Sequence, residues 1–65
     1  MVQINGEAVN AAGKTVGAYL KETGIDPQRV AVEYNNKILS KEAYDTTQMS
    51  DDDVVEIVNF VGGGC

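Results

Sequence analysis

A single helical pattern, set between segments with strand periodicity, constrains the fold of this chain more than any other feature. Val16, Tyr19 and Leu20 recur at i, i+3 and i+4 and give one apolar face to a short helix that begins at Val16. Thr15 is suited to cap its first turn, and Gly24 is suited to end it with a positive φ. The apolar face of this helix needs a partner, and the flanking segments predict a sheet that supplies one.

Strand patterns precede and follow the helix. Residues 2–9 alternate around Asn5-Gly6, a dipeptide that favours a type I′ hairpin because both central residues need positive φ. Residues 30–34 alternate with period two and predict a third strand with one buried face. After a turn at residues 35–37, Ile38-Leu39 predicts a short returning strand.

The connection to the last strand is polar and irregular from Ser40 to Ser50, and Tyr44 and Met49 are its expected inward anchors. The aspartates at residues 51–53 lack the spaced oxygens, glycine and distant glutamate of a calcium loop. We interpret them as a solvated turn.

The last strand is expected from Val54 to Phe60, and parity assigns its faces. Val55 and Ile57 share one face, which we expect to point inward. The other face carries Glu56, and a charged side chain is tolerated cheaply only in water, so this face is expected to be the outer one.

The predicted order is a hairpin, a helix, a strand, a short strand and a final strand. A helix packed across one face of a sheet buries both apolar faces in two layers. We therefore expect an α+β domain over residues 1–61, with a mixed sheet of four to five strands and one main helix packed across it. This is the β-grasp arrangement of ubiquitin-like domains. Residues 62–65 are expected to form a flexible C-terminal tail.

Composition excludes several classes of function. The 65 residues carry a formal net charge of −5 and no run of Lys or Arg, so nucleic acid is an unfavourable partner. With no His and one Cys, neither a zinc site within the chain nor Ser-His-Asp catalysis is available. The sequence contains no apolar stretch of membrane-spanning length, its first residues lack the basic start and long apolar run expected of a signal peptide, and the single Cys cannot form an internal disulfide. These features predict a cytoplasmic protein.

The tail is the candidate working part. Gly62, Gly63 and Gly64 precede Cys65 and directly follow the last predicted strand. Extended at about 3.3 Å per residue, five residues reach roughly 16 Å beyond the sheet. A tail of this kind can enter a narrow active site that the body cannot, and the absence of Cβ atoms leaves its backbone carbonyls open to attack.

The order of elements, residues 53–61 and the glycine end resemble the ThiS family of sulfur carriers for thiamine thiazole synthesis. The Asn5-Gly6 hairpin and residues 32–35 are similar to that family too, and the likeness covers essentially the whole chain. The resemblance implies a protein cosubstrate, not an enzyme. It also implies no bound cofactor, because ATP and the sulfur donor are used by a partner enzyme.

The resemblance further implies a reaction at the end of the tail. A ThiF-like adenylating enzyme would adenylate the carboxylate of Gly64, or alternatively of Gly63. A persulfide from a cysteine desulfurase, or another persulfide donor, would convert the adenylate to a thiocarboxylate. This group would then supply sulfur to thiazole synthase. Val58, Phe60 and Val61, beside the tail, are the predicted docking residues for these partners.

Cys65 departs from the family pattern, in which a glycine ends the tail. Our first hypothesis is that a protease removes Cys65 and exposes the Gly64 carboxylate. A passive extra residue is the second interpretation, and thiol chemistry at Cys65 is the third. The alternative functions are a sulfur carrier for molybdopterin, cysteine or homocysteine synthesis, a ubiquitin-like modifier or binding module, and a small redox thiol protein.

Overall fold

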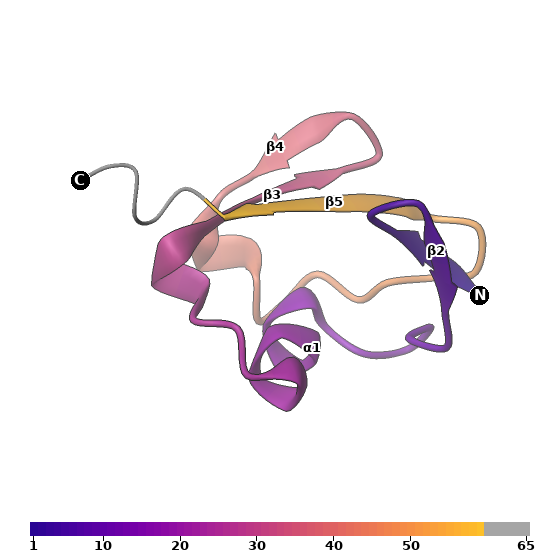
Figure 1. Ribbon diagram of the computed structural model, residues 1–65, viewed down its shortest axis with the longest axis horizontal. Helices are drawn as coiled ribbons and strands as arrows, with labels where there is room; N and C mark the ends of the chain where they lie inside the picture. The colour runs from indigo at the N-terminus through magenta and orange to yellow at the C-terminus, as the bar shows by residue number, and fades with distance from the viewer. Residues whose placement is uncertain (60–65) are drawn as a thin grey trace.

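The computed structural model describes residues 1–59, which form a five-stranded sheet with one α-helix on one side of it (Figure 1). The strands are β1 (Val2–Ile4), β2 (Glu7–Val9), β3 (Val30–Tyr34), β4 (Lys37–Leu39) and β5 (Val54–Asn59), and the helix is α1 (Val16–Thr23). The order across the sheet is β2-β1-β5-β3-β4. Strands β1 and β5 are parallel and the other pairs are antiparallel, so the sheet is mixed, as predicted.

Both hairpins are closed by two residues with positive φ. Asn5 and Gly6 have φ of 52° and 84° and join β1 to β2, which confirms the predicted turn. Asn35 and Asn36 have φ of 52° and 72° and join β3 to β4. Lys37, which the sequence placed in this second turn, is instead the first residue of β4, because a loop of two residues suffices.

Helix α1 begins and ends where its capping residues predict. The Thr15 hydroxyl accepts a hydrogen bond of 3.1 Å from the backbone N–H of Ala18. Gly24 takes a left-handed conformation with φ 79°, and its N–H donates to the carbonyl of Lys21 at 3.2 Å. Leu20 has no exposed surface, so the apolar side of the helix lies against the sheet.

The core lies between α1 and the inner face of the sheet. Its members are apolar side chains from every part of the chain that packs on this face: Val2, Ile4, Ala11, Val16, Leu20, Val30, Val32, Tyr44, Met49 and Val55. Tyr44 and Met49 come from the long connection between β4 and β5 and are 3% and 2% exposed, which confirms both as inward anchors. This connection also contains a single 3₁₀ turn at Lys41–Ala43, and another such turn at Pro27–Arg29 leads into β3.

Gly17 marks the closest approach of α1 to that connection. Its N–H donates to the Tyr44 carbonyl at 2.8 Å, and a Cβ at this position would overlap the carboxylate of Asp45. The glycine inside the first turn of α1 therefore reflects close packing. The cost of glycine in a helix, about 0.5–1 kcal/mol relative to Ala, accompanies this approach.

Candidate functional site

Strand β5 connects the body to the predicted tail. It lies in the middle of the sheet, with β1 on one side and β3 on the other. Its pairing with β3 continues to its last residue, where Asn59 lies opposite Val30. The predicted site residues Phe60, Val61, Gly62, Gly63, Gly64 and Cys65 lie outside the part of the chain that the structure describes. Strand β5 is the described part of the chain that leads directly to them.

Asp53 fixes the start of β5. Its carboxylate accepts a hydrogen bond from the Tyr34 hydroxyl, one of 2.8 Å from the Ser50 N–H and one of 3.3 Å from the Asn35 side-chain amide. The side-chain oxygen of Asn35, Oδ1, in turn accepts from the Val54 N–H at 2.8 Å. The interpretation of residues 51–53 as a solvated turn is therefore wrong for Asp53, which is half-buried and ties β5 to the end of β3.

These contacts change the acidity of both partners. The hydrogen bond from Tyr34, helped by those from Ser50 and Asn35, holds the pKa of Asp53 below its ordinary value of 3.8. The same bond to Asp53, with burial adding to it, raises the pKa of Tyr34 to about 12. The pair therefore stays as a carboxylate and a neutral phenol across the physiological range, which is the state that the hydrogen bond requires.

Asn5 holds the middle of β5 with its side chain. Strand β1 pairs with β5 only at Gln3 and Ile4, because the chain then turns into the hairpin. The side-chain oxygen of Asn5, Oδ1, accepts from the Ile57 N–H at 2.7 Å, and its side-chain Nδ2 donates to the Ile57 carbonyl at 3.3 Å. The side-chain amide thus takes the place of the next peptide group that a longer β1 would have supplied.

Within residues 1–59, no helix lies over the outer face of the sheet, the face away from α1 (Figure 1). We use this name for the side-chain surface formed by Ala31, Glu33, Ile38, Val54, Glu56 and Val58. Val54 and Val58 are 41% and 54% exposed, whereas Val55 is 1% exposed. The predicted parity of the last strand is therefore confirmed for the residues described. Val58, one of the three predicted docking residues, is therefore exposed near the end of β5.

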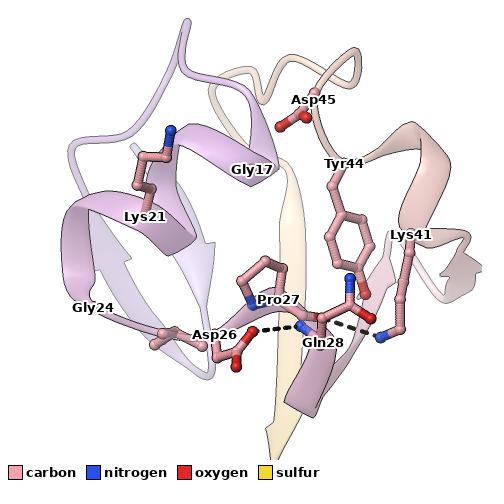
Figure 2. A pocket seen from close by; sticks show the side chains of 10 residues that line it. Gly17, Lys21, Gly24, Asp26, Pro27, Gln28, Lys41, Tyr44 and Asp45 are labelled. Carbon is pink, nitrogen blue, oxygen red and sulfur yellow. Dashed lines mark hydrogen bonds between the residues drawn. The ribbon is translucent and has the colours of Figure 1, made fainter.

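A hollow of about 440 Å³ lies on the helix side, between the end of α1 and the two 3₁₀ turns (Figure 2). The Lys41 ammonium is used within the fold: it donates to the carbonyls of Pro27 and Val30 at 3.0 and 2.9 Å. Asp26 accepts from the Gln28 N–H at 2.9 Å. These charges stabilise the local chain, and the hollow supplies no further functional residue.

Two features are absent from residues 1–59. No group of three or more metal-ligating side chains comes together there in a way that could hold a metal ion. No helix in this part of the chain is long and apolar enough to cross a membrane.

A mixed five-stranded sheet with one helix across it, and a central last strand that leads to a glycine end, defines a ubiquitin-like β-grasp domain. The chain belongs to the ThiS family, whose family model matches residues 2–64. The match confirms the resemblance inferred from the sequence.

Named relatives agree with this assignment. The chain is 39% identical to the sulfur carrier protein ThiS of Bacillus subtilis, and the match covers 98% of this chain and all of that protein. A crystal structure of the thiamine biosynthesis protein ThiS from Geobacter metallireducens matches with a TM-score of 0.76 and 34% identity, over 97% of each chain. A thiazole synthase of Paramagnetospirillum magneticum is 48% identical over 94% of this chain. The chain spans only about a fifth of the length of that protein and of a second thiazole synthase, from Magnetococcus marinus.

Proposed function

We propose that the protein is a sulfur carrier of thiamine biosynthesis that acts as a cosubstrate in the cytoplasm and performs no catalysis itself. One observation carries this proposal. The ThiS family match extends from the β-grasp body through Gly64, so it includes the segment on which carrier chemistry would take place. The relatives named as sulfur carriers match over their whole length, which supports the same function.

The proposed chemistry takes place at the carboxylate of Gly64, or alternatively of Gly63. A ThiF-like enzyme transfers AMP from ATP to this carboxylate and releases pyrophosphate. The terminal sulfur of a persulfide, supplied by a cysteine desulfurase or another donor, then attacks the carbonyl and AMP leaves. A second thiol cleaves the resulting S–S bond, leaving a thiocarboxylate on the carrier and a disulfide on the donor side. The bound ATP and the sulfur donor belong to the partner enzymes.

Exposure of this carboxylate requires a separate step. Cys65 follows Gly64, so the Gly64–Cys65 peptide bond has to be hydrolysed before Gly64 can be adenylated. We propose that a protease performs this step. It consumes one water molecule and leaves a chain end without a side chain, which suits a narrow active site.

The proposed partners dock beside the tail. Val58 is exposed on β5, next to the segment that carries the other two predicted docking residues, Phe60 and Val61. Thiazole synthase is a proposed partner because two thiazole synthases contain a segment similar to this chain within a longer protein. The adenylating enzyme, the persulfide donor and the protease are proposed from the carrier chemistry.

Reconstitution tests the proposal. Chains ending at Gly64 and at Cys65 are each incubated with ATP and the ThiF-like enzyme of the source organism, and pyrophosphate release is measured. A persulfide donor and a thiol are then added, and the intact mass is recorded. We expect pyrophosphate and an oxygen-to-sulfur mass change only for the chain ending at Gly64. If the chain ending at Gly64 gives neither pyrophosphate nor the mass change, the carrier function is contradicted. Transfer of its acyl group to lysines supports the modifier alternative instead.

A further inference from the structure

Two carboxylates face each other at the centre of the outer face. Glu33 of β3 and Glu56 of β5 are direct partners in the antiparallel register, and both side chains are exposed. The Cβ atoms of directly opposite residues lie about 4.5–5.5 Å apart. Like charges in this arrangement destabilise a sheet, so this pair is unfavourable in the free domain.

Apolar side chains surround the pair. Ile38 lies opposite Glu33 on the far side, on β4, and is 79% exposed. Val54 and Val58 precede and follow Glu56 on the same face of β5. Exposed apolar side chains on both sides of a central charged group give the composition of a protein interface in which an apolar contact area encloses one polar anchor.

None of the lysine and arginine side chains of this chain belongs to the outer face, and the N-terminal ammonium pairs with Asp51. All five basic residues fall within residues 1–59: Lys14, Lys21, Arg29, Lys37 and Lys41. Lys14 pairs with Glu22, Arg29 with Asp26, and Lys41 with two backbone carbonyls. Lys21 borders the hollow on the helix side. Lys37 lies opposite Tyr34 and next to Ile38 on β4, so strand alternation directs it to the other face.

We propose that the outer face binds a partner protein that inserts one cationic side chain, an arginine guanidinium, between Glu33 and Glu56, with apolar residues around it. A guanidinium is planar and carries donors on several edges, so it can bridge two adjacent carboxylates. Such a contact removes the repulsion that the free domain carries and adds charge-assisted hydrogen bonds. The inference rests on the proposed function for the identity of the partner, the ThiF-like adenylating enzyme.

The test uses Glu33→Gln, Glu56→Gln and the double variant in the chain ending at Gly64, with Glu42→Gln as the matched control. Glu42 is exposed in the 3₁₀ turn at Lys41–Ala43, away from the outer face, and its replacement removes the same charge. The dissociation constant for the adenylating enzyme is measured by calorimetry at two salt concentrations. Thermal unfolding of each free variant is recorded alongside.

The expected results have opposite signs for stability and binding. Each single outer-face variant raises the melting temperature of the free domain, because repulsion is removed, and weakens binding about tenfold. The double variant loses less than the product of the two single losses, since one guanidinium contacts both carboxylates. Glu42→Gln changes neither quantity by a comparable amount.

Three other outcomes separate this inference from the proposed function. Unchanged affinity in the outer-face variants overturns the inference, while pyrophosphate release by the same samples would leave the carrier function standing. Weakened binding in these variants, together with no pyrophosphate release by the unmodified chain ending at Gly64, supports the inference and contradicts the function. Absence of binding by the unmodified chain overturns the inference, since the named partner is then not the one that the face recognises.

Discussion

Replacement of Asn5 by Gly isolates the contribution of the side chain that extends the pairing of β5. Asn5 has φ 52°, a value that Gly adopts without strain, so the type I′ turn is retained while both hydrogen bonds to Ile57 are lost. Neutral hydrogen bonds contribute about 0.5–1.5 kcal/mol each, net of solvation. One of these is short at 2.7 Å and one is long at 3.3 Å, and both are reached by water, so we expect a loss of about 1–2 kcal/mol.

Asn36→Gly provides the matched control for this change. Asn36 occupies the second position of the other two-residue turn, with φ 72°, and makes no side-chain hydrogen bond among the described residues. The effect of glycine on the unfolded chain is the same at both positions, so the difference between the variants reports the Asn5 side chain. For a domain of this size, 1 kcal/mol corresponds to about 4–8 °C in melting temperature.

Thermal unfolding and amide hydrogen exchange together measure this effect. Asn5→Gly is expected to melt roughly 4–16 °C below Asn36→Gly and to lose protection of the Ile57 N–H. Equal melting temperatures with an unchanged Ile57 exchange rate would refute the claim that this amide group holds the last strand.

Three further predictions concern the body of the domain. Hydrogen bonds lower the pKa of Asp53 in the folded state, so its contribution to stability is present above about pH 4 and is lost as the pH falls through the lower folded pKa. Asp53→Asn should remove this loss. The measurement is the unfolding free energy as a function of pH from 5 to 2, which should be flatter for the variant. Gly17→Ala should stabilise the domain by about 0.5–1 kcal/mol in an Asp45→Ala background. With Asp45 present the gain should be smaller, because the new Cβ displaces that carboxylate. A double-mutant cycle measured by urea unfolding that shows no coupling between the two positions would contradict the close approach. Leu20→Ala, which empties the centre of the core, should cost about 2–5 kcal/mol, and a melting temperature within a few degrees of the parent would show that α1 is not packed as described.

Local chemistry explains why much of the fold could be predicted from the sequence. The Asn5-Gly6 turn and the cap at Thr15 depend on neighbours a few residues away, so their signals lie within short segments. The parity of the last strand also follows from a short alternation, in which Glu56 identifies the outer side.

The contacts that fix β5 depend on register, which the sequence pattern does not state. Asn5 bonds to a residue 52 positions away, and no local pattern distinguishes this asparagine from an ordinary turn residue. Three consecutive aspartates carry no mark that shows which one meets Tyr34; the pairing of β3 with β5 selects Asp53. The opposition of Glu33 and Glu56 is hidden for the same reason, although strand alternation could have assigned each glutamate to an exposed face.

The proposed function concentrates on the end of the tail, whereas the described part of the chain accounts for its support. Asp53 at the start of β5 and Asn5 beside its middle hold the strand that leads to the glycines. The outer face gives a partner a surface beside that strand. A body with these features can remain folded while its tail is consumed and regenerated, as a cosubstrate requires.

The intact mass of the protein purified from its own cells tests the central claim most directly. The account predicts a species that ends at Gly64, of which a fraction has one oxygen replaced by sulfur. A protein that retains Cys65 and carries a thiocarboxylate would contradict the proposed cleavage. A protein that retains Cys65 and shows no sulfur substitution under thiamine-limited growth would contradict the carrier function itself.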